Sequence, residues 1–363
     1  LGITGSTGNS YTITYSVTYN STVISTQQSS ISITYGDAAK LAITTQAAGF
    51  VNRTDFTTQP IVEIRDSANN KVANSTANVT ISIDSGTLTG TNKTVAAVAG
   101  VATFAGIGKT GTVGSKTLTF TSGSLATDSQ PFTLTHGAAT QVVLTAPSSL
   151  VNDTVMATQP VATIQDADGN TVTSGADATQ TVTLTSTNAT ISGTTSMPAV
   201  AGVADFIGKG VKLRGLIGAR NLTATISSPS TINGLASVTI TYGTATKVVL
   251  TTQAAGFVNR ADFTTQPIAQ IQDVSGNVVA NSNDNVTISI DSGTLTGANK
   301  TVAAVNGIAT FSGIGKTGTI GSKTITFSSG SLATDSQTFT LTHGAAAQVA
   351  VTLPSSVSSG FAL

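Results

Sequence analysis

The sequence predicts an all-β protein built from tandem immunoglobulin-like β-sandwich domains in an elongated array. The first observation behind this prediction is a period of two, because Val79, Ile81 and Ile83 alternate with polar residues in residues 78–84. Such alternation is typical of a strand buried on one face. The second is composition: Thr, whose branched side chain suits a half-buried strand, supplies 68 of the 363 residues. The third is an internal repeat of about one hundred residues, enough for one sandwich.

The repeats set the expected domain organisation. Residues 36–136 and 243–343 each hold 101 residues and differ at only 23 positions, and residues 137–242 are a diverged copy of 106 residues. Residues 1–35 match the last third of a repeat, and residues 344–363 match the first twenty residues of one. We therefore expect three whole Ig-like domains, preceded by the C-terminal part of a partial domain and followed by the N-terminal part of a further repeat.

Short apolar runs separated by turn signals predict the strands of the first whole repeat. Seven or eight short strands per hundred residues indicate a β-sandwich. The chain has no Cys and no Trp, so packing alone must close the core. The expected strands are residues 40–45, 59–66, 70–74, 78–84, 92–98, 101–105, 115–121 and 129–135.

The junctions between repeats are short. Residues 134–139 lead from a last strand almost directly into the next first strand, with no Pro- or Ser-rich linker. We therefore expect limited bending between domains. Three sandwiches in line predict a rod on the order of 100 Å.

Two segments of the first repeat resemble a known family. Residues 56–66, Asn70 and residues 100–104 (Gly-Val-Ala-Thr-Phe) are similar to prokaryotic Ig-like tandem repeats of large cell-surface proteins. That family includes invasin- and intimin-style adhesins and surface-layer or filament proteins. The resemblance implies an Ig-like fold and a stalk, lattice or filament role at the cell surface.

Composition excludes several classes of function. Lys plus Arg and Asp plus Glu both number 16, so the formal charge is zero and we expect no nucleic-acid partner. No run of eighteen apolar residues is present, so we expect no membrane span. The lack of Cys does not indicate the cytosol. The chain opens without Met, which suggests either a removed leader or a piece of a longer array.

No motif predicts catalysis or a cofactor. His136 and His343 occupy the same repeat position with no second ligand nearby, so we interpret them as strand-end residues. Residues 106–110 resemble a phosphate loop but lack its first Gly, which favours a glycine-rich hairpin loop. We expect no catalytic residue and no cofactor.

The middle repeat carries two weaker candidates. Asp166, Asp168 and Asn170 are spaced like the opening of a calcium loop, but the acidic residue needed further on is absent, so a tight turn competes with calcium binding. A second cluster gathers the positive charge of this repeat, as a solvated face or as a docking patch for an acidic partner. Its residues are Lys209, Lys212, Arg214 and Arg220.

Ten Asn-X-Thr sequences are candidates for N-glycosylation, and we expect glycans on some of them. Chance would also produce many in a chain this rich in Thr. The candidates are Asn20, Asn52, Asn74, Asn78, Asn92, Asn152, Asn188, Asn221, Asn285 and Asn299.

These observations favour a structural component of an extracellular assembly, such as a surface layer, sheath or filament, that acts through subunit packing and strand-edge contacts. The alternative is the passive stalk of a cell-surface adhesin whose binding tip lies outside this chain. The expected partners are copies of the chain or other cell-surface components. The partial end domains are either completed by neighbouring subunits or cut from a longer array.

Overall fold

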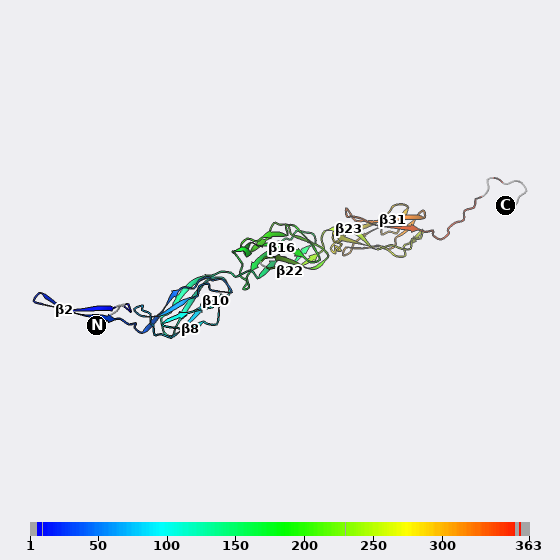
Figure 1. Cartoon of the computed structure of the whole chain (residues 1–363). Helices are drawn as coiled ribbons and strands as arrows, with labels where there is room; N and C mark the ends of the chain where they lie inside the picture. The colour runs from blue at the N-terminus through cyan, green and yellow to red at the C-terminus, as the bar shows by residue number, and fades with distance from the viewer. Residues whose placement is uncertain (1–5, 9, 229, 353–355, 357–363) are drawn as a thin grey trace.

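The computed structural model describes residues 6–8, 10–228, 230–352 and 356. Three β-sandwiches follow one another in line, and a two-stranded hairpin extends from the first of them (Figure 1). Within the described residues the only helical segment is one 3-10 turn, Ala176–Thr179. The structure thus confirms the predicted all-β class and the elongated array of sandwiches.

The first repeat, residues 36–136, forms three small antiparallel sheets with the orders β3-β5-β9, β4-β10-β7 and β12-β11-β6-β8. Their strands are β3 (Ala38–Thr45), β4 (Thr54–Asp55), β5 (Ile61–Asp66), β6 (Asn78–Ile83), β7 (Thr87–Thr89), β8 (Thr94–Ala96), β9 (Val101–Thr103), β10 (Gly108–Thr110), β11 (Gly114–Thr121) and β12 (Asp128–Leu134).

The middle repeat, residues 137–242, has the sheet orders β13-β15-β19, β14-β22-β21-β16-β18 and β17-β20. Its strands are β13 (Gln141–Thr145), β14 (Ser149–Val151), β15 (Val161–Gln165), β16 (Thr181–Ser186), β17 (Thr190–Ser192), β18 (Ser196–Pro198), β19 (Val203–Asp205), β20 (Lys212–Arg214), β21 (Gly218–Ile226) and β22 (Ile232–Thr241).

The third repeat, residues 243–343, repeats the arrangement of the first, as their near-identity requires. Its strands are β23 (Ala245–Thr252), β24 (Ala261–Asp262), β25 (Ile268–Asp273), β26 (Asn285–Ile290), β27 (Thr294–Thr296), β28 (Thr301–Ala303), β29 (Ile308–Thr310), β30 (Gly315–Thr317), β31 (Gly321–Ser328) and β32 (Asp335–Leu341).

The N-terminal hairpin pairs β1 (Ser10–Tyr19) with β2 (Thr22–Ser32) and stands apart from the sandwiches. Nearly all of its side chains are exposed, including Tyr15 and Tyr19. An isolated two-stranded ribbon is marginally stable in water. The hairpin therefore contributes little apolar burial to the chain.

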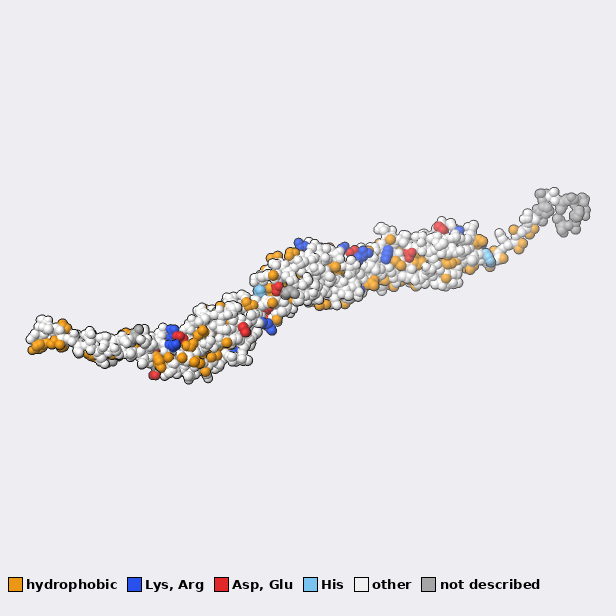
Figure 2. All heavy atoms as spheres, viewed as in Figure 1, with side chains coloured by type: hydrophobic (Ala, Val, Ile, Leu, Met, Phe, Trp, Pro, Cys, Tyr) orange, Lys and Arg blue, Asp and Glu red, His pale blue; other side chains and the backbone are white. Residues whose placement is uncertain are grey.

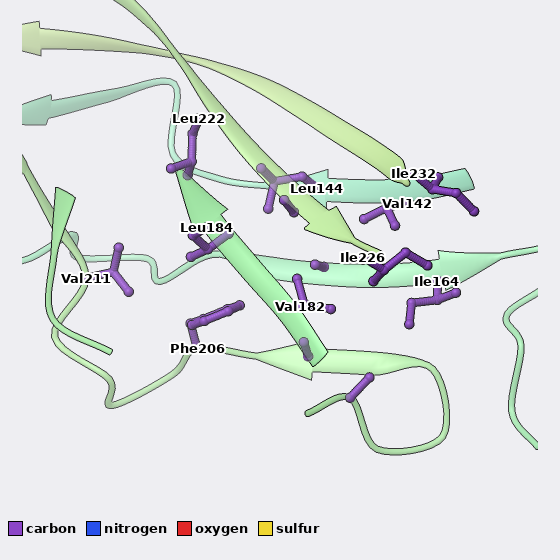
Figure 3. Close-up of a cluster of buried hydrophobic side chains, with 14 of the residues drawn as sticks. Val142, Leu144, Ile164, Val182, Leu184, Phe206, Val211, Leu222, Ile226 and Ile232 are labelled. Atoms are coloured by element: carbon purple, nitrogen blue, oxygen red, sulfur yellow. The ribbon is translucent and has the colours of Figure 1, made fainter. Parts of the chain in front are cut away.

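Each sandwich has its own core, drawn from one repeat. In β6, Val79 and Ile81 are buried while the residues between them face outward, as the period of two predicts. The core of the middle repeat includes Leu184, Phe206 and Leu222, which converge between its sheets (Figure 3). Separate cores allow each sandwich to be stabilised by its own burial of apolar surface.

Aromatic packing closes one end of the first repeat in place of a disulfide. Phe50 stacks on Phe132 with ring centroids 4.0 Å apart, and Phe56 meets Phe50 edge-on at 5.0 Å. Such pairs stabilise a core by about 1 kcal/mol beyond their burial. Phe257, Phe263 and Phe339 make the same cluster in the third repeat.

Two expectations about the strands were wrong. Residues 70–74 form no strand, because Asn69 takes a left-handed conformation and only a single bridge, Arg65 to Lys71, follows the turn. The sheet of β4, β10 and β7 was also missed. Its strands are two or three residues long, too short for a period of two to be visible.

In each sandwich a short segment that follows the first strand runs parallel to the end of the last strand. Val51 bridges Thr135 in parallel, and the N–H of Asn52 donates to the carbonyl of Thr135 at 3.0 Å. Val258 bridges Thr342 in the same way, and the middle repeat pairs β14 with β22 over three residues. Each repeat is therefore closed by a parallel contact between its two ends.

The visible surface carries few charges and is mostly polar and uncharged (Figure 2). Hydroxyls pair across neighbouring strands, as between Thr80 and Thr94 at 2.9 Å and between Thr287 and Thr301 at 2.9 Å. Each cross-strand hydroxyl pair stabilises a sheet by about 0.2–1 kcal/mol. The many Thr residues thus form the outer faces of the sheets.

Candidate functional site

The most elaborate polar arrangement lies at the two joints between the sandwiches. We use "first joint" for the contact between the first and middle repeats and "second joint" for that between the middle and third. Each joint brings together an Asn at the end of a parallel bridge, the Gly that opens the next repeat, and a tight turn of that repeat. In the first joint this turn is residues 166–170, where Gly169 takes a left-handed conformation.

Asn52 spans the first joint. Its Nδ2 donates to Asp166 Oδ2 and to Asp168 Oδ2, both at 2.8 Å. Its Oδ1 accepts the N–H of Gly111 at 3.1 Å within its own repeat. Asp166 Oδ2 also accepts the N–H of Gly137 at 2.9 Å. One buried amide therefore joins the end of one sandwich to the acidic turn of the next.

Asn170 completes the contact from the other side. Its Oδ1 accepts the N–H of Val113 at 3.0 Å, and its Nδ2 donates to the carbonyl of Gly111 at 3.0 Å. Asp166 Oδ1 in turn accepts the N–H of Asn170, which holds the turn in shape. We call these contacts of Asn52, Gly137, Asp166 and Asn170 the clasp.

The second joint repeats the clasp. Asn152 Nδ2 donates to Asp273 Oδ2 at 2.8 Å and to Ser275 Oγ at 2.9 Å. Asp273 Oδ2 accepts the N–H of Gly243 at 2.8 Å, and Asn277 Oδ1 accepts the N–H of Ile217 at 2.8 Å. The clasp is thus a property of the repeat and not of one sequence variant.

The linker glycines leave no room for a side chain. A Cβ on Gly137 would lie 2.8 Å from the carbonyl oxygen of Asn52, and one on Gly243 would lie 2.7 Å from that of Asn152. Such contacts are below van der Waals distance, so a larger residue would push the sandwiches apart. This close approach explains why a Gly opens the middle and third repeats.

The clasp lowers the pKa values of its carboxyl groups. Burial would raise the pKa of Asp166, but the N–H donors of Gly137, Asn170 and Asn52 outweigh it and lower that pKa to about 2. The pKa of Asp273 is lowered in the same way, against burial, by Asn277 and Gly243. Both carboxylates are therefore ionised at neutral pH.

Charge distinguishes the two joints. At the first joint Arg53 forms a fork on Asp168, with Nη2–Oδ1 2.6 Å and Nε–Oδ2 3.0 Å, and this hydrogen bond lowers the pKa of Asp168. Asp153 holds the position of Arg53 in the middle repeat and pairs with Lys212 of that repeat at 2.8 Å. No ion pair between described residues crosses the second joint.

The predicted calcium candidate lies in the first clasp. Asp166, Asp168 and Asn170 are brought together, but their oxygens accept hydrogen bonds from Asn52, Arg53 and neighbouring N–H groups. Among the described residues, no group of three His, Cys, Asp or Glu side chains is placed to hold a metal ion. Calcium binding stays a prediction: a melting temperature that does not change with EDTA would contradict it.

Eight of the ten glycosylation candidates are exposed: Asn20, Asn74, Asn78, Asn92, Asn188, Asn221, Asn285 and Asn299. Asn52 and Asn152 differ, because each is 2% exposed and its side-chain nitrogen is bonded across a joint. A glycan on that nitrogen would displace the clasp. The glycosylation proposal is therefore kept for the exposed positions.

The two histidines follow the last strands of their repeats, His136 at the first joint and His343 at the far end of the third repeat. His136 Nδ1 lies 2.9 Å from the carbonyl oxygen of Gly137, and its Nε2 accepts the N–H of Ser174 in the middle repeat at 3.2 Å. His343 lies at the equivalent place in the third repeat and is exposed. His136 thus adds a further hydrogen bond to the first joint.

The basic cluster of the middle repeat is divided among separate partners. Lys212 pairs with Asp153, Arg214 reaches the carbonyl of Val274 across the second joint, and Arg220 donates to Leu216. Lys209 is exposed. A hollow of about 600 Å³ lies beside Arg214 and Ser275 at this joint.

The loop that resembles a phosphate loop hides a buried lysine. Lys109 lies on β10, is fully buried, and donates to the carbonyl of Thr110. Burial lowers its pKa, and Lys116 lowers it further. Lys316 repeats the arrangement, whereas Leu213 stands at the same position in the middle repeat. We did not predict this from the sequence, because a Lys beside glycines is typical of an exposed loop.

We also did not predict the clasp as a site. We identified Asn52 and Asn152 only as glycosylation candidates, and residues 166–170 only as a tight turn or a weak calcium candidate. One signal was available: Asn recurs as Asn52, Asn152 and Asn259 at one repeat position, although only the first two lie in Asn-X-Thr sequences.

Comparisons with known proteins give similarities of architecture. No family model matches the chain, and no curated protein sequence matches it. Invasin, a bacterial integrin-binding protein, is 14% identical, with 92% of this chain and 65% of that chain covered and a TM-score of 0.33. The Escherichia coli adhesin FdeC is 16% identical over 86% of this chain and 100% of that chain, with a TM-score of 0.36.

The surface-layer protein SbsC, domains 4–9, is 14% identical over 85% of this chain and 48% of that chain, with a TM-score of 0.24. The chain thus spans less than two thirds of the invasin and SbsC structures. The chain resembles Ig-like repeats of bacterial surface proteins, and at these TM-scores the likeness carries no argument about function. No helix among the described residues is long and apolar enough to cross a bilayer.

Proposed function

We propose that the chain is a stiff structural rod in an extracellular, cell-surface assembly, such as a surface layer, sheath or filament, and that it has no enzymatic activity. The clasp at successive joints is the observation that carries this proposal. It connects neighbouring sandwiches through a buried Asn, an ionised Asp and a Gly with no space for a side chain. A joint built in this way resists bending, which a rod must do and a flexible linker does not.

Repeated apolar side chains support packing between subunits. Val98, Val200 and Val305 occupy the same tight turn in the three repeats and are 76%, 75% and 69% exposed. In the first repeat the turn is held by reciprocal bonds between Val98 and Val101. An apolar side chain offered once per repeat suits lateral contact with a second copy or another surface component at matching intervals. Glycans on exposed Asn residues would be compatible with such packing.

The alternative is the passive stalk of an adhesin, in which the rod only projects a binding tip that lies outside this chain. The same joints favour it, because a stalk also needs stiffness. The exposed valines distinguish the two functions, since a stalk has no need of lateral contacts.

Negative-stain electron microscopy tests the proposal. We expect ordered lattices or fibres from the chain at high concentration, and their loss when Val98, Val200 and Val305 are all changed to Ser. Substitution of Val143, Val151 and Leu235 by Ser, which are also exposed, is the matched control. Isolated straight rods in every case would support the stalk, and rods that bend freely at the joints would contradict both functions.

A further inference from the structure

The far end of the third repeat carries the same residues as the end of the first repeat that docks on the middle one. Asn259, Arg260, Gly318 and Ile320 stand where Asn52, Arg53, Gly111 and Val113 stand in the first repeat. The only difference among these four positions is Ile for Val.

The geometry of this end is also kept. Asn259 Oδ1 accepts the N–H of Gly318 at 3.1 Å, as Asn52 Oδ1 accepts that of Gly111 at 3.1 Å. Arg260 has φ 65°, close to the 62° of Arg53. The half of the clasp that belongs to the preceding repeat is therefore present before any partner is in contact with it.

This end is more exposed than its counterparts. Ile320 is 61% exposed, against 42% for Val113 and 49% for Ile217 at the two joints. Asn259 is partly exposed, whereas Asn52 is buried. Arg260 makes no ion pair with any described residue. The donors and the apolar residue of a joint are thus offered here to a partner.

Charge at the joints specifies which partner fits. The residue that faces Asn52 and Arg53 is Asp168 in the middle repeat, and the equivalent residue is Ala68 in the first repeat and Ser275 in the third. All three turns share the carboxylate of Asp66, Asp166 or Asp273, and only a turn of the middle type presents a second carboxylate to an Arg. In the middle repeat, Asp153 stands at the position of Arg53 and would repel a carboxylate at the position of Asp168. The third repeat, which comes next, has the neutral Ser275 at that position.

The sequence after the third repeat points to the same type. Residues 344–356 match the opening of the middle repeat at 9 of 13 positions, but match the openings of the first and third repeats at only 5 and 4. A Cβ on Gly344 would lie 2.4 Å from the carbonyl oxygen of Asn259, the same close approach as at Gly137.

We infer that a docking surface for a β-sandwich of the middle type is formed by Asn259, Arg260, Gly318 and Ile320. The docked sandwich begins at Gly344, and Arg260 selects the acidic turn of the middle type. The paired charges thereby order the sandwiches so that the two types alternate. This inference goes beyond the proposed function and does not depend on whether the rods assemble.

The test extends the chain by one sandwich. Residues 344–363 are replaced by a second copy of residues 137–242, and hydrogen exchange is measured at the N–H of Ile320. We expect this N–H to become protected to about the level of Val113, which is bonded to Asn170 in the first joint. A chain extended with residues 36–136, which carry Ala68 in place of Asp168, is the matched control and should protect Ile320 less.

Charge reversal tests the role of Arg260. In the matched extension, Arg260→Asp should speed exchange at Ile320 by about fivefold, the upper range for a partly exposed ion pair. Asp168→Arg made in the appended copy should then restore protection. Equal protection in both extensions, or no effect of Arg260→Asp, would overturn the selection by charge. An Ile320 that stays unprotected beside a folded appended copy would overturn the docking surface.

A second measurement needs no added sandwich. In the chain as it is, Arg53→Asp should speed exchange at Val113 by about fivefold and leave Ile217 unchanged. The double variant Arg53→Asp with Asp168→Arg should restore it. Unchanged exchange at Val113 would contradict the selection of sandwich type by charge, even if the extended chains did not fold.

Discussion

The first and second joints make the same backbone and amide contacts but differ in charge. The first adds the Arg53–Asp168 pair, while at the second Asp153 pairs with Lys212 of its own repeat and the neutral Ser275 bonds Asn152. The repeats that flank them differ in a related way, because Lys109 is buried in the first repeat where Leu213 is buried in the middle one. The comparison teaches that hydrogen bonds to backbone groups make the joint, and that charged side chains give each joint its identity.

Removing the shared acceptor should have the largest effect. Asp166→Ala leaves the N–H groups of Gly137 and Asn170 without their carboxylate acceptor and removes one of the two acceptors of the Asn52 amide, so we expect a loss of about 3 kcal/mol in the stability of the first joint and the turn beside it. Asp273→Ala should do the same at the second joint. Differential scanning calorimetry measures both, and Asp37→Ala, on an exposed residue, is the control. An effect of Asp166→Ala no larger than that of the control would contradict the clasp.

Replacing the buried lysine should change the stability of the first repeat. Lys109→Leu copies the middle repeat, and we expect it to stabilise the first repeat by about 1–3 kcal/mol because no buried cation remains. Burial lowers the folded pKa of Lys109, so the unfolded chain holds the proton more tightly. The destabilisation is complete below the folded pKa and is relieved as pH rises toward the unfolded value of about 10.4.

Thermal unfolding as a function of pH measures this effect. The wild-type chain should gain stability relative to Lys109→Leu as pH rises above neutral. A constant difference between the two across the alkaline range would show that the ammonium is not the cause.

Acid should open the first joint more than the second. The folded pKa of Asp166 is about 2 and that of Asp168 is also lowered, whereas Asp273 acts alone among the carboxylates of the second clasp. Because these folded pKa values lie below the unfolded value of about 3.9, their stabilisation is present above that value and is lost as pH falls toward 2. Asp166 alone contributes about 2 kcal/mol of it.

Hydrogen exchange at Val113 and Ile217 between pH 5 and pH 2, corrected for intrinsic rates, distinguishes the joints. Asp166→Asn should reduce the acid sensitivity at Val113 only. Equal loss of protection at both joints would contradict the role assigned to the additional carboxylate.

Truncating the exposed charge should have the smallest effect. Arg53→Ala removes the ion pair with Asp168 but leaves the clasp, so we expect only a small loss of stability at the first joint, because solvent screens an exposed ion pair. The difference between the variant and the wild type should shrink as salt is added, because the guanidinium is half exposed. The same measurement with Arg260→Ala provides the control, and a large effect that does not respond to salt would indicate a structural role for Arg53.

The fold could be predicted from the sequence, whereas the side-chain contacts that connect the sandwiches at the joints could not. Alternation in β6, β11 and β12 is a local pattern that burial enforces, so it can be read from neighbouring residues. The clasp joins Asn52 to Asp166, which are 114 residues apart. Nothing in the local sequence of either residue indicates that partner, and the same letters also match a glycosylation sequence and a calcium loop.

The burial of Lys109 could not be predicted from the sequence either. It depends on residues that surround Lys109 only in the folded chain, among them Gly86, whose lack of a side chain leaves space for the ammonium. The short strands β4, β7 and β10 could not be predicted for a different reason: they are too short to show a pattern, and only their pairing with one another defines them.

The parallel closure of each sandwich has a mechanical consequence. When the rod is pulled along its length, the two chain segments that meet at Val51 and Thr135, or at Val258 and Thr342, are drawn in opposite directions. Their hydrogen bonds are then loaded in shear, so they share the force and must break together and not one after another. Asn52 lies at the end of this contact and also spans the joint, so tension passes from one sandwich to the next through the bonds that hold each of them shut.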